Sequence, residues 1–344
     1  MRLADLTTLR VGGPARAFAA PESEADLVAQ IRDLDHLRVP VLLLGAGSNL
    51  VVADSGFDGT VVRIGHSGTQ VSRGSSPDVV NVTVAAGEVW DRVVERCVVE
   101  GLAGVEGLSG IPGLTGATPI QNVGAYGQDV SRTIRWVRVL DRTTGTVATV
   151  AATECGFSYR SSLFKHRPDG VDRHVVLAVQ FELSRSGTSE PIRYDELARL
   201  LGGRADVVGA ALGDVRDAVL ELRRSKGMVL DEDDPDTVSV GSFFMNPLLD
   251  QSAAAALPDR APTWPDSSGL VKTSAAWLIE NAGFSRGYGS GAARISSKHS
   301  LALINAGGAT TEDVLALARQ IRDRVVTLFG IELHPEPRLV GCAL

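Results

Sequence analysis

The stretch Gly107-Leu108-Ser109-Gly110-Ile111-Pro112-Gly113-Leu114-Thr115-Gly116-Ala117 decides what kind of fold this chain can adopt. It continues into Pro119-Ile120-Gln121-Asn122-Val123-Gly124-Ala125-Tyr126-Gly127. So much glycine, proline and small polar character cannot build an ordinary core helix or strand. Long structured loops of this kind are usually functional, and flat cofactors with a diphosphate need such backbone-lined walls. The alternative is a compact Ω-loop with a purely structural role.

A second glycine block, Leu44-Gly45-Ala46-Gly47-Ser48-Asn49-Leu50, follows an expected buried strand. A glycine-rich turn after a strand brings backbone N–H groups close to an anion, because no Cβ intervenes. The block lacks the Rossmann fingerprint, since its sixth position holds Leu50, and no Gly-Lys-Ser/Thr of a P-loop follows. A structural turn and a phosphate cradle therefore both remain open for this block.

Strands and helices are expected on either side of these blocks. Ser23 with Asp26 forms a capping box that starts a helix. Val79-Val80-Asn81-Val82-Thr83-Val84 alternates as a strand does. The expected strands are residues 15–20, 39–44, 51–64, 79–84, 135–140, 146–151 and 174–183, and residues 89–99 are expected to be helical.

A polar stretch over residues 200–213 indicates a domain boundary, and three helices are expected after it. The apolar face of the first helix is Val215, Ala218, Val219 and Leu222. The residues that cap and end the other two are Ser274 with Gly283, and Thr310 and Asp313 with Gly330. The last helix has the apolar stripe Val314, Leu317, Ala318, Ile321, Val325 and Leu328, and residues 331–333 are expected to return as a strand.

Length and charge exclude some classes of protein. At 344 residues the chain exceeds what one hydrophobic core usually covers, so two or three domains are expected. The net charge of -7 argues against a generic nucleic-acid surface, although a local basic cluster can still bind an anion. The acidic run 231–236 lacks the ligand spacing of a calcium loop, so we expect a solvated loop and no metal site.

Cysteine usage and hydropathy indicate the compartment. Cys97, Cys155 and Cys342 form no CxxC pair and no disulfide framework, so we expect small buried thiols in a reducing environment. The first residues place acids and hydroxyls where a signal peptide needs an apolar stretch, and no run approaches the roughly 20 apolar residues of a membrane helix. We expect a cytoplasmic protein that binds neither a membrane nor nucleic acid; its oligomeric state is open, with a monomer favoured.

Taken in order, these motifs resemble the UDP-N-acetylenolpyruvoylglucosamine reductase (MurB) family of peptidoglycan synthesis. The matching segments are residues 8–15, 44–50, 110–113, 121–127, 159–165, 241–247, 275–280 and 335–338, which span nearly the whole chain. The resemblance implies an α/β fold with a two-lobed FAD-binding domain of the vanillyl-alcohol-oxidase type and a C-terminal α/β substrate-binding domain. The implied parts are residues 1–65 joined by 331–344, residues 66–205, and residues 206–330.

The implied reaction adds a hydride and a proton across the C=C of UDP-N-acetylglucosamine enolpyruvate, with NADPH as reductant and noncovalent FAD as hydride carrier. Ser242 matches the family's proton donor, and Arg160 matches the arginine that faces the substrate carboxylate. Glu336 matches the third catalytic residue; protonated it would donate a hydrogen bond, and ionised it would orient Arg160. On local pattern alone these three could be a turn serine, a surface arginine and a solvated glutamate.

The resemblance also implies binding residues. Those expected to contact FAD are Gly45, Ala46, Gly47, Ser48, Asn49, Gly110, Ile111, Pro112, Gly113, Gln121, Asn122, Gly124, Ala125 and Tyr126. Those expected to contact the substrate are Tyr159, Tyr194, Lys226, Asn246 and His299, where Tyr194 marks the family branch with a tyrosine-containing substrate loop. For His299, a structural role is an equal alternative.

Two departures and two rival functions accompany this reading. Met245 stands where relatives carry lysine or threonine, and His334 stands where glutamate is common. One rival is an oxidase with covalently tethered flavin, but the glycine blocks contain no Cys or His to hold a tether. The other is a nucleotide-binding module without catalytic activity, which predicts no NADPH turnover.

Overall fold

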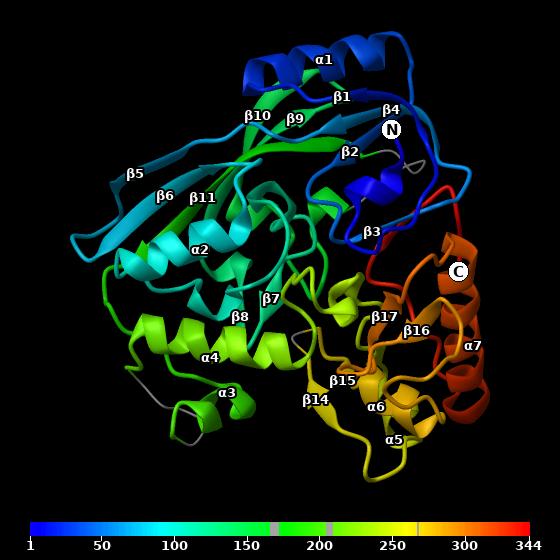
Figure 1. The fold of residues 1–344 in the computed structure, drawn as a ribbon. Coiled ribbons are helices and arrows are strands. Elements are labelled where there is room, and N and C mark those ends of the chain that lie inside the picture. Colours follow the sequence, from blue (N-terminus) through cyan, green and yellow to red (C-terminus); the bar gives the residue numbers. More distant parts are fainter. Residues whose placement is uncertain (166–171, 204–208, 267) are drawn as a thin grey trace. The chain divides into compact units, whose positions relative to one another are not determined.

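Two compact units make up the chain in a computed structural model that describes residues 1–165, 172–203, 209–266 and 268–344. Unit 1 comprises residues 1–15, 47–57 and 226–344, and unit 2 comprises residues 16–46 and 58–225 (Figure 1). The three-part division expected from the sequence stays a prediction, because the two compact units do not test where its boundaries lie. Residues 204–208 of the expected boundary lie outside the described residues.

An antiparallel five-stranded sheet forms the centre of unit 2 (Figure 1). Its order is β10 (Thr146–Ala151), β9 (Ile134–Asp141), β11 (His174–Ser184), β6 (Val79–Ala85) and β5 (Thr69–Arg73). The alternation of β6 buries Val80, Val82 and Val84 on one face. These valines join the core that also contains Trp90 of helix α2 (Trp90–Val99). Strand β5 had no clear signal in the sequence, because four of its five residues are exposed.

A smaller sheet in unit 2 has the order β1 (Ala15–Ala19), β4 (Phe57–Arg63) and β2 (Val41–Leu44). Strands β2 and β4 are parallel, and residues 45–56 between them give the long connection that parallel strands need. Helix α1 (Glu24–His36) begins after Ser23, whose hydroxyl accepts the Asp26 N–H, as the capping box predicts. Its buried residues Leu27, Val28 and Ile31 pack into one cluster with Val41 and Val62.

Helices α3 (Asp195–Leu200) and α4 (Leu212–Ser225) pack against each other in unit 2. The predicted face of α4 is buried: Val215, Ala218, Val219 and Leu222. Together with Ile192, Leu197 and Ala198 this face forms a small separate core. The helical periodicity of the sequence thus identified both the helix and its buried side.

Unit 1 contains three small sheets and three α-helices among its described residues. The sheets are β12 (Ser239–Ser242), β17 (Ala302–Asn305) and β16 (Ala293–Ile295); β13 (Leu248–Leu249), β15 (Val271–Thr273) and β14 (Thr263–Pro265); and β18 (Arg338–Val340) with β3 (Leu50–Val52). The helices are α5 (Gln251–Ala255), α6 (Ala275–Asn281) and α7 (Thr311–Phe329). Their apolar residues share one core with Phe243 and Phe244.

The C-terminal helix is where the sequence-based expectations were both confirmed and corrected. Thr310 caps α7 and Gly330 ends it at φ 67°, as predicted. The stripe is buried through Val325, but Leu328 is 44% exposed, because the covered part of the helix ends before its last turn. The strand expected at 331–333 is wrong: this segment has no regular structure, and the returning strand is β18, which pairs with β3 in parallel.

No helix within the described ranges has the length and apolarity needed to cross a membrane.

A carboxylate distant in the sequence supports the start of α7. Asp54 accepts the Thr311 N–H at 2.9 Å and the Glu312 N–H at 3.3 Å, so it satisfies two donors that the helix leaves open. Asp54→Ala is expected to lower the free energy of unfolding by about 1–2 kcal/mol, as loss of an N-terminal cap does. Urea unfolding followed by circular dichroism measures this loss.

Asp58→Ala is the matched control for Asp54→Ala. Asp58 pairs with Arg16 at 3.4 Å, and both side chains are largely exposed. Its removal should change the free energy of unfolding by less than about 0.5 kcal/mol. Equal losses in the two variants would show that Asp54 has no special role in α7.

Candidate active site

A β-bulge sets the position of Ser242. Ser239 pairs with Ile304 and Ser242 pairs with Ala302, so three steps along β12 oppose two along β17. Gly241 lies inside the bulge at φ 73°, a backbone conformation that glycine adopts without strain. Bulges commonly re-aim a side chain next to a functional site. Ser242 is half-buried, at the end of this strand.

Residues 334–336 lie beside the segment that follows Ser242. The Phe243 C=O accepts the Glu336 N–H at 2.8 Å, and the Met245 N–H donates to the His334 C=O at 3.0 Å. Phe244 and Pro335 form a bridge between these bonds. The structure therefore brings Ser242 and Glu336, two of the predicted catalytic residues, onto adjoining backbone segments of unit 1.

The second glycine block ends beside Glu336. Asn49 Nδ2 donates to the Glu336 C=O at 3.5 Å, and the Arg338 N–H donates to the Asn49 C=O at 2.9 Å. Gly47 has φ 65°, and a Cβ there would lie 2.0 Å from the Leu6 carbonyl oxygen. Only glycine fits this turn, which places Asn49, a predicted FAD ligand, next to Glu336.

A loop held by Asp236 lies on the other side of Ser242. Asp236 accepts the N–H and the hydroxyl of Ser297 at 2.8 and 2.6 Å. Burial raises the pKa of Asp236, but these bonds outweigh it and hold that pKa below its ordinary value. The His299 C=O accepts the N–H of Ala302, the partner of Ser242, at 3.1 Å. His299 thus lies one turn from the strand that pairs with Ser242.

The expectation of a solvated acidic loop is wrong for Asp236, which is buried. Sequence reasoning missed its role because the run 231–236 contains five acids with no pattern that singles out one of them. Asp234 binds Lys298 at 2.6 Å, so the run holds the 296–299 loop by two side chains. In the described part of the chain, no cluster of His, Cys, Asp and Glu is arranged to hold a metal ion.

Two further predicted substrate residues belong to unit 1. Asn246 Oδ1 accepts the Ala275 N–H at 3.0 Å, at the start of α6, so its side chain also supports that helix. Lys226 is half-buried and precedes Gly227, which has φ 65° and lies against Asp236. Met245 and His334 are the two departures from the family pattern. Their backbones bond to each other in the ladder between residues 243–245 and 334–336, and the His334 side chain is exposed.

In unit 2, the long glycine loop is tied by its backbone to the start of α2. The Gly113 C=O accepts the Trp90 N–H at 3.1 Å, and the Leu108 C=O accepts Trp90 Nε1 at 3.3 Å. Gly110 and Gly113 have φ values of 70° and 138°, which favour glycine. A Cβ at Gly116 would lie 2.5 Å from the Ala86 Cβ. The loop therefore has a defined conformation, as predicted for a structured loop.

Arg160 occupies a strained turn. Its φ is 52°, a left-handed conformation that is uncommon for non-glycine residues and often marks functional sites. Its guanidinium lies over the Tyr159 ring, 5.6 Å from the centroid. Asn122, itself at φ 45°, donates to the Ser158 C=O at 3.3 Å and accepts the Ser131 N–H at 3.1 Å. A predicted FAD ligand thus supports the turn that carries Arg160.

Tyr126 and Tyr194 make an edge-to-face contact with centroids 5.2 Å apart. Burial raises the pKa of Tyr194 to about 12, so its phenol stays protonated at neutral pH. Burial also lowers the pKa of the nearby Arg223, which shares a hydrogen bond with Tyr126. These contacts join the predicted substrate segment at Tyr194 to the glycine block that ends at Gly127.

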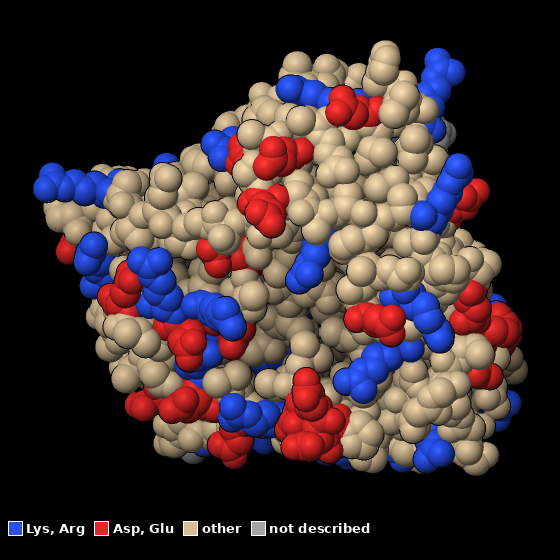
Figure 2. Space-filling view, turned by 45° about the horizontal axis from the view of Figure 1, so that its top comes forward, with Lys and Arg blue, Asp and Glu red and all other residues tan. Residues whose placement is uncertain are grey.

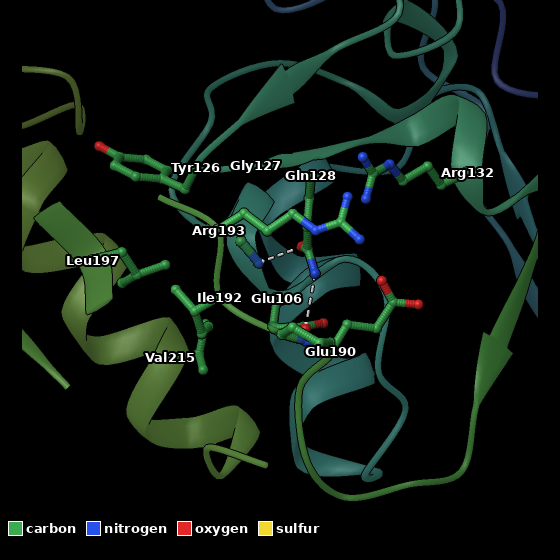
Figure 3. Close-up of a pocket in the computed structure, with 12 residues that line it drawn as sticks. Glu106, Tyr126, Gly127, Gln128, Arg132, Glu190, Ile192, Arg193, Leu197 and Val215 are labelled. Atoms are coloured by element: carbon green, nitrogen blue, oxygen red, sulfur yellow. Dashed lines mark hydrogen bonds between the residues drawn. The ribbon is translucent and has the colours of Figure 1, made fainter. Parts of the chain in front are cut away.

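A small pocket of about 20 Å³ lies beside Tyr126 and Gly127 (Figure 3). The fully buried Glu106 accepts Gln128 Nε2 at 2.8 Å and the Gly104 N–H at 2.7 Å. Gln128 in turn accepts the Gly107 N–H at 2.7 Å. This network stabilises the two ends of the glycine loop against each other.

The predicted site residues thus fall into two groups, one in each unit. Both groups combine glycines at positive φ with neutral amide side chains, a donor set that suits a noncovalent cofactor carrying a diphosphate. The described thiols are buried or half-buried, and burial raises the pKa of Cys97 to about 12. On the face shown in Figure 2, Lys and Arg side chains are interspersed with Asp and Glu and make no continuous basic surface.

Comparison with known proteins gives consistent matches over almost the full length. Residues 15–151 match the model of an FAD binding domain, and residues 234–340 match that of the UDP-N-acetylenolpyruvoylglucosamine reductase C-terminal domain. The UDP-N-acetylenolpyruvoylglucosamine reductase of Thermobifida fusca is 55% identical over 99% of this chain and 97% of its own length. That of Streptomyces coelicolor is 51% identical over 99% of this chain and 90% of its own length.

Among solved structures, the crystal structure of UDP-N-acetylenolpyruvylglucosamine reductase (MurB) from Thermus caldophilus matches with a TM-score of 0.65. It is 25% identical, and the match covers 99% of this chain and 97% of that chain. These matches confirm the fold class expected from the sequence, an FAD-binding domain followed by a C-terminal domain of this family.

The left-handed backbone at Arg160 predicts an unusual order of stability. At this position Arg160→Gly should be more stable than Arg160→Ala by about 1 kcal/mol, because the positive φ strains alanine and does not strain glycine. Arg38, at φ 54°, should show the same order. Urea unfolding of the four variants measures both differences.

Arg319 within α7 is the control, because glycine there should be less stable than alanine by about 1 kcal/mol. If glycine were also the less stable residue at position 160, the strained turn would be refuted.

Proposed function

The chain belongs to the UDP-N-acetylenolpyruvoylglucosamine reductase family, and we propose that it reduces UDP-N-acetylglucosamine enolpyruvate to UDP-N-acetylmuramate with NADPH as the reductant. Members of this family are FAD-dependent oxidoreductases of peptidoglycan synthesis. The observation that carries the detailed proposal is the ladder that joins the Ser242 segment to Glu336, with the Glu336 N–H 2.8 Å from the Phe243 C=O.

The residues that would hold FAD belong to the two glycine blocks. We assign this role to residues 45–49 and 110–113, together with Gln121, Asn122 and the 124–126 turn. Their glycines and amides provide backbone and neutral side-chain donors for a diphosphate and a flat ring system. The chemistry that bound FAD supplies is hydride transfer from N5 to the terminal methylene carbon of the enolpyruvyl group.

Ser242 delivers the proton in this proposal. After hydride addition, negative charge develops on the carbon next to the carboxylate, so a nearby acid must protonate that carbon. A serine hydroxyl is a weak acid, and it needs a dry, ordered position to act. The buried rings of Phe243 and Phe244, 5.1 Å apart, exclude water from the backbone beside Ser242.

Arg160 and Glu336 stabilise the developing charge. A guanidinium keeps its charge and its planar fork matches a carboxylate, so Arg160 holds the substrate carboxylate as negative charge spreads into it. Glu336 has its backbone held by the Phe243 C=O and by Asn49, beside the segment that follows Ser242. There it either donates a hydrogen bond to the enolate or orients Arg160.

The remaining predicted residues recognise the UDP group. Lys226 supplies positive charge and Asn246 an amide donor for the diphosphate. Tyr194 covers the nucleotide, supported by its edge contact with Tyr126, and Tyr159 and His299 contact the substrate nearby. NADPH would supply the reducing equivalents to FAD when that cofactor is bound.

Ser242→Ala tests the proton-donor role. With UDP-N-acetylglucosamine enolpyruvate, the variant should lose at least about 100-fold in turnover, the usual contribution of a general acid. Reduction of bound FAD by NADPH should persist, because that step needs no proton from Ser242. NADPH loss at 340 nm and stopped-flow flavin absorbance measure the two steps separately.

Ser23→Ala is the control. Ser23 caps α1 in unit 2, where its hydroxyl accepts the Asp26 N–H at 3.1 Å, so its loss should lower stability and leave the chemistry intact. Equal turnover by Ser242→Ala and the wild type would remove Ser242 from the mechanism.

Cofactor attachment separates this reductase from a flavin oxidase with a covalent tether. The glycine blocks hold no Cys or His, so FAD should pass fully into the filtrate when the holoenzyme is unfolded in guanidinium and ultrafiltered. Flavin that remained on the denatured chain would favour the oxidase.

A further inference from the structure

A partly buried carboxylate joins the glycine loop of unit 2 to two helices. Asp91, in the first turn of α2, accepts the Gly110 N–H at 2.6 Å through Oδ1. Arg216 of α4 reaches the same carboxylate with both terminal nitrogens, Nη1 to Oδ1 at 2.7 Å and Nη2 to Oδ2 at 2.9 Å. The Arg216 side chain is 11% exposed and that of Asp91 is 35% exposed, so water screens this forked pair only in part.

The bond from the Gly110 N–H and the forked bonds from Arg216 depend on the same carboxylate charge of Asp91. Burial raises the pKa of Asp91, but the bonds from Arg216 and Gly110 outweigh it, and its pKa is lowered. The carboxylate therefore stays charged and accepts strongly from the Gly110 amide. Gly110 is buried, at φ 70°, and it opens the segment that continues to Gly113. Holding its N–H fixes where this segment lies against the start of α2.

Arg216 also cancels a charge that an anionic cofactor would otherwise meet. A lone carboxylate bound to the first amide of the loop would repel a diphosphate nearby, and a paired carboxylate repels it far less. Arg216 lies next to Val215, whose buried side chain packs in the core shared by α3 and α4. The pair is thus anchored by packing on the α4 side and by the helix start on the α2 side.

We propose that Asp91 and Arg216 form a positioning pair that holds residues 110–113 in the conformation that binds FAD. This inference rests on the proposed role of that loop in FAD binding. Neither residue is assigned contact with the substrate or with the reacting atoms. Their effect passes through the Gly110 amide, so it should appear in cofactor affinity before it appears in chemistry.

The chain contains a matched pair for the experiment. Arg142 and Asp35 also form a forked ion pair in unit 2, with 8% and 26% of their side chains exposed. Asp35 lies in α1, and Arg142 follows β9. Among the residues that the structure describes, neither side chain of this pair bonds to a glycine block, and Arg142 Nη1 donates instead to the Asp172 C=O at 3.0 Å. Asp35→Asn therefore weakens a similar ion pair without touching the loop.

The measurement is release of FAD from the holoenzyme on dilution, followed by the rise of free flavin fluorescence, at a temperature well below unfolding. Asp91→Asn should raise the dissociation constant for FAD at least about tenfold, because a neutral amide oxygen accepts less strongly from the Gly110 N–H and the amide nitrogen cannot accept the second bond of the Arg216 fork. Asp35→Asn should change it less than about twofold, although both variants should lower the melting temperature. Equal dissociation constants for Asp91→Asn and Asp35→Asn would overturn the proposal.

A charge-swapped variant separates positioning from simple bracing. Asp91→Arg combined with Arg216→Asp can restore an ion pair between α2 and α4, but arginine has no acceptor for the Gly110 N–H. Stability should recover in the double variant while FAD affinity stays low. Recovery of both would show that bracing alone suffices, which contradicts the proposal. If the swapped protein does not fold, Arg216→Lys takes its place in the experiment. This variant keeps the charge and loses the fork, so its dissociation constant for FAD should lie between those of the wild type and Asp91→Asn.

Gly113→Ala distinguishes a failure of this inference from a failure of the loop assignment. Gly113 has φ 138° and receives no bond from Asp91, so alanine there disturbs the loop directly. If Gly113→Ala weakens FAD binding and Asp91→Asn does not, only the positioning pair is wrong. If neither variant affects FAD binding, residues 110–113 are not the FAD-binding loop.

Discussion

The backbone ladder between residues 243–245 and 334–336 is the constraint on which the proposed catalytic half depends. It places Glu336 beside the strand that ends in Ser242, and Asn49 fastens the same segment from the other side. Bonds of this kind join backbone to backbone, so they fix where the chain at Glu336 lies relative to the segment that follows Ser242. Losing one strand of this ladder would displace every proposed catalytic group of unit 1 together.

Strained backbone conformations occur in the predicted site residues of unit 2. Arg160, Asn122 and Tyr126 all have positive φ, and bonds from Asn122 connect the turn of Arg160 to the glycine block. Such conformations persist only where the surroundings over-determine them. Their concentration in the segments that carry predicted cofactor and substrate residues supports a site built for preorganisation. The five-stranded sheet below supplies the rigidity, with Trp90 and Phe181 in its core.

Local patterns predicted most helices and strands, because an element that buries one face has apolar residues at regular intervals in the sequence. The face of α4 and the caps of α1 and α7 were readable in this way. Non-local pairing leaves no such pattern, so the sequence placed the return strand at 331–333 and missed β18. It also treated Asp236 as one acid of a solvated run, since its partner Ser297 is distant in the chain. The motifs named the site residues only through resemblance to a family, and nothing in their spacing predicted the contact of Asp91 with Gly110.

The discontinuity of unit 1 has a consequence for the newly made chain. Its three segments, residues 1–15, 47–57 and 226–344, meet through pairs such as Arg338 with Leu50 and Thr311 with Asp54. Synthesis proceeds from the N-terminus, so residues 47–50 of the second glycine block are made long before residues 336–340, which they contact in the folded protein. Unit 2 can fold in the meantime. The parallel partner of β3 is made after all the other strands described above. Assembly of the Ser242 and Glu336 region therefore waits until residues 334–340 have been made, and a polypeptide that stops before them lacks this half of the proposed site.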